Sequence, residues 1–145
     1  MAWTIRSLNP THNLMMPVRD AASAEGFRFI ERCVRDWTLG YNRFDGAGET
    51  LLGAFADEAL VGLCGLSRDP YAANAKTGRL RHLYVVREYR RRGLGSDLTV
   101  KVLDGASETF DVVRLRTDTS SGVAFYEQLG FAQVQEEDAT HLIEL

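Results

Sequence analysis

The segment that most constrains this chain is residues 83–96, LYVVREYRRRGLGS, in which an apolar run leads through arginines to two glycines. Leu98, Val102 and Ala106 follow at four-residue spacing, which predicts a helix over residues 95–109. The first amides of a helix lack intrahelical partners and carry a partial positive charge. Glycines let a phosphate approach that backbone closely, and arginines add charge-assisted contacts. The segment therefore predicts a cradle for a pyrophosphate.

Two other phosphate-binding motifs fit this segment less well. A Walker A loop ends in Gly-Lys-Ser/Thr, whereas Gly95 is followed by Ser96 and Asp97. The dinucleotide-binding fingerprint needs a third glycine at the position of Leu98. Neither class of nucleotide-binding protein is therefore favoured.

The remaining pattern predicts one mixed α/β domain over residues 1–145. A helix is expected from an N-cap at Asp20 to a stop at Gly40, because Phe27, Ile30 and Val34 recur on one face. The other expected elements are a strand at 3–8, a hairpin of 50–56 and 59–66, strands at 79–86 and 112–117, a helix at 121–129, and strands at 131–135 and 140–145.

Two motifs resemble those of the GNAT superfamily, the Gcn5-related N-acetyltransferases. Residues 90–95, RRRGLG, match the acyl-CoA motif Gln/Arg-x-x-Gly-x-Gly/Ala, and residues 124–131, AFYEQLGF, resemble the family's late-helix signature. The expected order of elements also follows the family, except that one helix instead of two follows the first strand. The resemblance implies a mixed, mostly antiparallel twisted sheet of about seven strands, flanked by helices.

The resemblance also implies a function: transfer of an acetyl group from acetyl-CoA to a primary amine, by direct attack in a ternary complex. A strand would pair with the pantetheine arm and the glycine turn would hold the pyrophosphate. The cofactor-binding residues implied in this way are Leu83, Tyr84, Val85, Arg90, Arg91, Arg92, Gly93, Leu94, Gly95, Ser96 and Thr119. Thr119 stands where many members have an asparagine that contacts the cofactor, and its hydroxyl can instead cap a helix.

Tyr126 and His82 are the candidate catalytic residues. Tyr126 lies in the late-helix signature, and its phenol can give a proton to the departing thiolate; the alternative is a core aromatic side chain. His82 is the titratable candidate for the general base; the alternative is a packed structural histidine. Strand alternation separates the side chain of His82 from those of Arg79 and Arg81 unless a bulge intervenes.

Arg79, Arg81 and Tyr71 are the candidate acceptor-binding residues. The arginines can bind an anionic part of the acceptor, such as a carboxylate, or form ion pairs with neighbouring acids. Tyr71 belongs to the loop Asp69-Pro70-Tyr71, which, with residues 42–45, lies where family members commonly wall the acceptor site. Whether the acceptor is a small molecule or a peptide is left open.

Composition limits the other possibilities. A net charge of -3 and a pI near 5.6 argue against a nucleic-acid partner. Neither a long apolar stretch nor the apolar core of a signal peptide is present, so we expect a cytoplasmic protein with no membrane partner. Cys33 and Cys64 are expected to be reduced core residues, and no metal is expected. A non-catalytic acyl-CoA-binding module is the alternative function, and a homodimer is left open.

Overall fold

The computed structural model describes residues 2–145 and has seven strands. The strands are β1 (Thr4–Ser7), β2 (Thr50–Ala56), β3 (Ala59–Arg68), β4 (Thr77–Val85), β5 (Val112–Leu115), β6 (Ala132–Gln133) and β7 (His141–Glu144). The helices are α1 (His12–Ala24), α2 (Phe29–Leu39), α3 (Leu94–Leu103) and α4 (Ser120–Gln128), with short 3-10 turns η1 (Arg87–Tyr89) and η2 (Ala106–Glu108).

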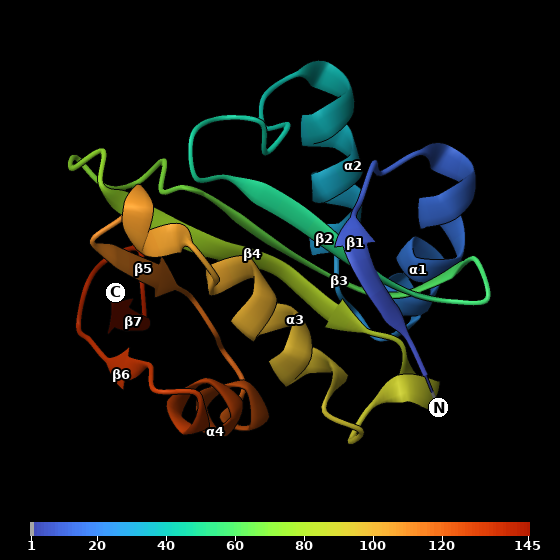
Figure 1. Cartoon of the computed structure of the whole chain (residues 1–145). Helices are drawn as coiled ribbons and strands as arrows, with labels where there is room; N and C mark the ends of the chain where they lie inside the picture. Colours follow the sequence, from blue (N-terminus) through green and yellow to red (C-terminus); the bar gives the residue numbers. More distant parts are fainter. Residues whose placement is uncertain (1) are drawn as a thin grey trace.

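All seven strands form one sheet in the order β1-β2-β3-β4-β5-β7-β6. Only β4 and β5 are parallel, and every other neighbouring pair is antiparallel. Helices α1 and α2 cover one face of the sheet, and α3 and α4 lie on the other (Figure 1). The predicted mixed, mostly antiparallel sheet of about seven strands with flanking helices is thus confirmed.

Each face of the sheet has its own apolar core. Leu94, Leu98 and Val102 of α3 pack against strands β2 to β5 on one face. Met15 of α1 and Ile30 of α2 belong to the cluster on the other face. Among residues 2–145, no helix is both long and apolar enough to cross a bilayer.

The single helix expected between Asp20 and Gly40 is wrong, because two helices occupy this region. Asp20 lies inside α1, and the chain turns at Gly26, whose φ of 86° ends that helix. Pro17 is the sixth residue of α1, and proline is unfavourable beyond the first turn of a helix, so the sequence did not indicate a helix there. The stop at Gly40 is confirmed, with φ of 80°.

The β4 strand contains an irregularity that the site depends on. Leu63 of β3 pairs with Tyr84, and Gly65 pairs with Arg81, so β4 has one residue more than β3 over this stretch. His82, with φ of 62°, takes up the extra residue. Such a bulge bends the strand and redirects its side chains.

Strands β4 and β5 part soon after they meet. Their pairing covers only Thr77, Gly78 and Arg79 of β4. Beyond Arg79, β4 is paired within the described chain only to β3, and its other backbone edge is open. The two strands therefore separate after Arg79, and the unpaired edge of β4 runs past the bulge to Val85, where the arginine-rich turn follows.

Candidate active site

The turn from η1 into α3 presents an unbroken row of free backbone donors. No amide from Arg91 to Ser96 makes a hydrogen bond of standard geometry to another residue of the described chain. The first intrahelical bond of α3 runs from the Asp97 amide to the Gly93 carbonyl, at 3.0 Å. Gly93 has φ of 85°, and a Cβ atom placed there would meet nothing within 4 Å. Six adjacent N–H groups and a helix N-terminus thus form a site suited to a phosphate group.

Arg90 holds this turn in place. Its Nη2 donates to Glu25 at 2.7 Å, and its Nε donates to the Val85 carbonyl at 2.8 Å. The Tyr84 hydroxyl donates to the same Glu25 oxygen at 2.7 Å. Burial alone would raise the pKa of Glu25, but the hydrogen bonds from Tyr84 and Arg90 outweigh it, and the net shift is downward. Arg91 and Arg92 are exposed and free to contact a ligand.

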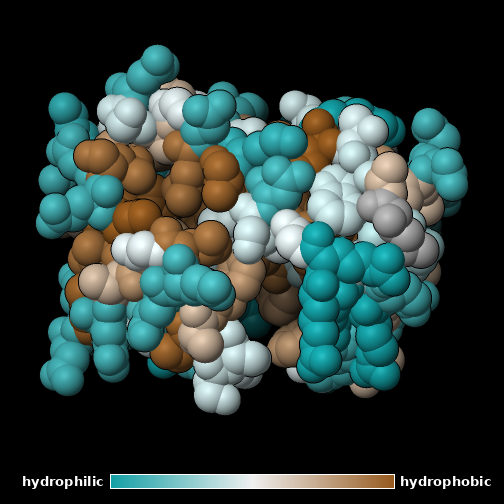
Figure 2. Space-filling view, turned by 60° about the horizontal axis from the view of Figure 1, so that its bottom comes forward, coloured by the Kyte–Doolittle hydropathy of each residue, from teal (hydrophilic) through white to brown (hydrophobic). Residues whose placement is uncertain are grey.

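The open edge of β4 leads through η1 to the turn that carries the free amides. Leu83 and Val85 pack against the apolar cluster beneath α3, whereas Tyr84 points to the opposite face. Figure 2 shows a hollow near the middle of the face that carries α3 and α4. Apolar side chains gather on the side of β5 to β7, and long hydrophilic side chains on the side of the turn before α3.

Tyr126 lies on α4 and packs against the apolar cluster beneath α3. Its ring makes edge contacts with Phe125 and Phe131, at centroid distances of 5.0 Å and 5.7 Å. Its hydroxyl forms no hydrogen bond with any other residue of the described chain. Burial, and to a lesser extent Cys64, raises the pKa of this phenol. Tyr126 is therefore protonated near neutral pH, and its hydroxyl is free to donate a hydrogen bond.

His82 lies on the α2 side of the sheet because of the bulge. Its ring contacts Phe44 edge-on at 5.9 Å between centroids, on the face that also receives Arg81. Burial, followed by the nearby Arg81 charge, lowers the pKa of His82 to about 3. The imidazole is therefore neutral in the folded protein, but it would hold an abstracted proton only weakly. Its catalytic role stays a prediction.

The two cysteines are buried and free. Burial raises the pKa of Cys33 to about 12 and also raises that of Cys64. Both thiols are protonated near neutral pH, which makes them poor nucleophiles. Within residues 2–145, no group of three or more His, Cys, Asp or Glu side chains could hold a metal ion.

The structure brings Arg81 together with the loops expected to wall the acceptor site. A cleft of about 240 Å³ lies between the loop that follows α2 and the end of β3. Asn42, Arg43 and Asp45 line it from the loop, and Arg68 and Pro70 from the other side. Arg81 reaches it from β4.

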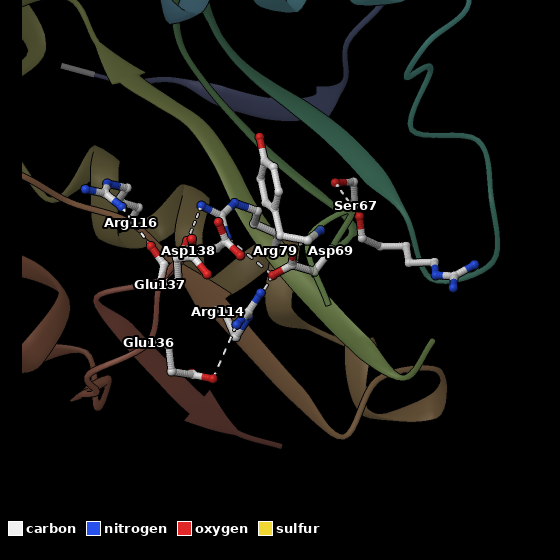
Figure 3. A network of polar contacts seen from close by, with 10 residues as sticks. Ser67, Asp69, Arg79, Arg114, Arg116, Glu136, Glu137 and Asp138 are labelled. Carbon is white, nitrogen blue, oxygen red and sulfur yellow. Dashed lines mark hydrogen bonds and ion pairs between the residues drawn. The ribbon is translucent and has the colours of Figure 1, made fainter. Parts of the chain in front are cut away.

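Arg79 lies instead in a buried ionic network (Figure 3). Its Nη1 donates to Asp69 at 3.3 Å and its Nη2 to the Asp138 carbonyl at 2.8 Å. The same Asp69 oxygen accepts from Arg114 at 2.8 Å, and Arg114 also reaches Glu136 at 3.3 Å. Arg79 therefore forms an ion pair with a neighbouring acid, which was the alternative to acceptor binding for this residue. The exposed Tyr71 ring lies 4.9 Å from the Arg79 guanidinium.

Thr119 acts as the N-cap of α4. Its hydroxyl accepts a hydrogen bond from the Gly122 amide at 3.0 Å. The helix-capping alternative thus holds for this residue, and a contact to cofactor stays a prediction. The sequence analysis missed Glu25, and it placed Asp69 in a loop beside the acceptor site without its ion pairs. Glu25 pairs with Arg90, 65 residues away, and Asp69 with Arg79 and Arg114, 10 and 45 residues away.

Comparisons with known proteins fit this geometry. The Acetyltransferase (GNAT) domain family matches residues 18–145. A candidate acetyltransferase from Exiguobacterium sp. 255-15 is 30% identical, with 99% of this chain and 94% of that chain covered and a TM-score of 0.87. A GNAT acetyltransferase from Staphylococcus aureus Mu50 is 18% identical over 99% of both chains, with a TM-score of 0.76. The PaiA N-acetyltransferase of Thermoplasma acidophilum, solved in complex with coenzyme A, is 22% identical, with 98% of this chain and 97% of that chain covered and a TM-score of 0.69.

Proposed function

The chain belongs to the GNAT acetyltransferase family, and we propose that it transfers the acetyl group of acetyl-CoA to a primary amine in the cytoplasm. The observation that carries this proposal is the row of free amides from Arg91 to Ser96, placed where the open edge of β4 ends. CoA has a pyrophosphate, which suits the row of free amides, and an extended arm with amide groups, which suits the open edge of β4.

The fit can be judged group by group. The amides of the turn bind the pyrophosphate, and the exposed Arg91 and Arg92 add charge-assisted contacts. The free backbone edge of β4 offers hydrogen bonds to the amides of the pantetheine arm. Val85 is the exception, because its carbonyl already accepts from Arg90.

Acetyl-CoA supplies the acetyl group and a thiolate that can leave. In the transfer, the amine nitrogen forms a bond to the acetyl carbon, the carbon–sulfur bond breaks, and the nitrogen loses one proton. Tyr126 is the residue we assign to the departing sulfur, to which it donates a hydrogen bond or a proton that solvent replaces, since its phenol keeps its proton near neutral pH and is unbonded. The high pKa values of Cys33 and Cys64 support direct attack by the amine over an acyl-cysteine route.

The acceptor amine must lose its proton before it attacks. His82 is too weak a base to retain a proton from an alkylammonium whose pKa is near ~10.4. We therefore expect the neutral amine to be taken from solution, or its proton to pass to water. Activity should then rise with pH along the titration of the acceptor itself.

The test is an acetyl-CoA turnover screen against primary amines, read through released thiol, together with calorimetry of CoA binding. Replacing Arg91 and Arg92 together by alanine should raise the acetyl-CoA KM at least about tenfold, because two charge-assisted contacts are lost. Arg6→Ala is the matched control, since β1 lies three strands from β4. CoA binding without turnover of any amine would support the non-catalytic module instead.

A further inference from the structure

The cleft beside Arg81 contains charged groups that the described chain leaves unpaired. Arg43, Arg68 and Arg81 line it, against the two acids Asp45 and Glu49. No ion pair joins any of these five side chains to another charged residue within residues 2–145.

Two of the five charged groups are already occupied in other ways. Glu49 accepts hydrogen bonds from the Gly46 and Arg68 amides, at 2.9 Å and 2.7 Å, and so fixes the loop to the end of β3. Arg43 donates to the Trp37 carbonyl at 3.0 Å and packs 5.3 Å from the Trp37 ring. The groups left for a ligand are therefore the guanidinium groups of Arg68 and Arg81 and the carboxylate of Asp45.

Arg81 connects this cleft to the reacting end of the proposed site. It lies one residue before the bulge at His82 and two residues after the last β4 residue paired with β5. Cys64 of β3 lies opposite this bulge, because its neighbours Leu63 and Gly65 pair with Tyr84 and Arg81, and Cys64 is close to Tyr126. An anion held by Arg81 would therefore keep an attached amine near the point where β4 and β5 separate.

We propose that the acceptor is a small amine that carries a carboxylate, of the amino-acid type, and that Arg81 and Arg68 bind this carboxylate. This inference rests on the proposed acetyl transfer. Guanidinium groups match carboxylates in a bidentate manner, and Asp45 offers an opposite charge to the ammonium form as it enters. The cleft of about 240 Å³ is below the roughly 300–1,000 Å³ of pockets for drug-sized ligands, so it suits a small molecule.

The experiment compares acceptors in matched pairs: each amino acid of a panel against its own carboxamide, with kcat/KM measured by thiol release. The wild-type protein should favour the acid by about tenfold or more, the typical effect of one charge-assisted contact. Arg81→Met should reduce this ratio toward one and leave CoA binding unchanged. Arg81→Lys should retain part of the preference for the acid, because lysine keeps the positive charge but cannot bind both carboxylate oxygens as a guanidinium group does. Arg6→Met, remote from the cleft, should keep the full ratio.

The outcomes separate the two proposals. CoA binding with no turnover of any amine in the primary-amine screen would overturn the proposed function, and this inference with it. Turnover of other primary amines but of no amino acid or carboxamide would overturn only the carboxylate-bearing acceptor. Turnover that favours the carboxamides, shows no preference, or keeps its preference in Arg81→Met would overturn only the carboxylate-bearing acceptor. A ratio that collapses in Arg81→Met and survives in Arg6→Met would establish the assignment.

Discussion

Asp69→Asn tests the buried network that joins β3, β4 and β5. The Asp69 side chain is fully buried and the side chains of Arg79 and Arg114 are 10% exposed. One carboxylate oxygen accepts from both arginines, and the other accepts from the Tyr71 amide at 2.9 Å. Asparagine keeps the shape, removes the charge, and turns one of these oxygens into a donor. Whichever way the amide points, an N–H group then faces another N–H group.

The loss of stability expected for Asp69→Asn follows from the partners that Arg79 and Arg114 keep. After the substitution, Arg79 and Arg114 lie buried with Glu136 as the remaining carboxylate partner, and that side chain is 42% exposed. Arg114 Nη2 already lacks a partner in the native protein. Removing one member of a buried ion pair typically costs about 3–5 kcal/mol of unfolding free energy. Asp118→Asn, which breaks a surface pair of 3.5 Å with Arg116, should cost roughly 0–1 kcal/mol.

Urea unfolding followed by circular dichroism measures this difference. With an m-value of about 2 kcal/mol/M, the midpoint should fall by about 1.5–2.5 M. Burial alone would raise the pKa of Asp69, but Arg114 and the Tyr71 amide lower it below its ordinary 3.8. The stabilisation is therefore complete above that value and is lost as the pH falls through the folded-state pKa. An Asp69→Asn protein within about 1 kcal/mol of wild type at pH 7 would refute the reasoning.

Four further results are expected. Tyr126→Phe should lower the single-turnover rate at least about tenfold with little change in CoA affinity; an unchanged rate would make the tyrosine structural. Gly93→Ala and Gly105→Ala should each lose roughly 1 kcal/mol of stability, because both glycines have positive φ and open space around them. Calorimetry should find weaker CoA binding only for Gly93→Ala. Glu25→Gln should weaken CoA binding several-fold, because it weakens the ion pair that fixes Arg90 at the turn before α3. Unaltered CoA affinity would contradict this role of Glu25. Burial lowers the pKa of His82 to about 3, so stability should fall as the pH drops below 6.5, by about 1–2 kcal/mol at pH 5; equal pH dependence in His82→Gln would exclude this cause.

The features that the sequence predicted well are those encoded by neighbouring residues. The β2–β3 hairpin is confirmed around Asp57 and Glu58, which both adopt positive φ as a tight two-residue turn requires. The glycine turn before α3 is also local, because its strand, glycines and helix follow one another. Its free amides could be expected from the lack of partners at any helix start.

The features that were missed depend on contacts between distant residues or on a local departure from regular geometry. The tie of Glu25 to Arg90 joins the end of α1 to the turn before α3, which no spacing along the chain indicates. The side chain of His82 could not be assigned to a face, because alternation holds only where the strand is regular. Arg79 shows the same limit: its charge was visible in the sequence, but the acid that neutralises it was not.

The early parting of β4 and β5 has a consequence for handling the protein. Sheets normally expose unpaired backbone only at their margins, where it invites pairing with other chains and aggregation. Here such an edge lies in the interior of a seven-stranded sheet, from the bulge to Val85. The ligand-free protein should therefore be the form most prone to aggregate. A bound pantetheine arm would act as the missing strand, and saturation at 100 Kd should add about 2.7 kcal/mol to the free energy of unfolding.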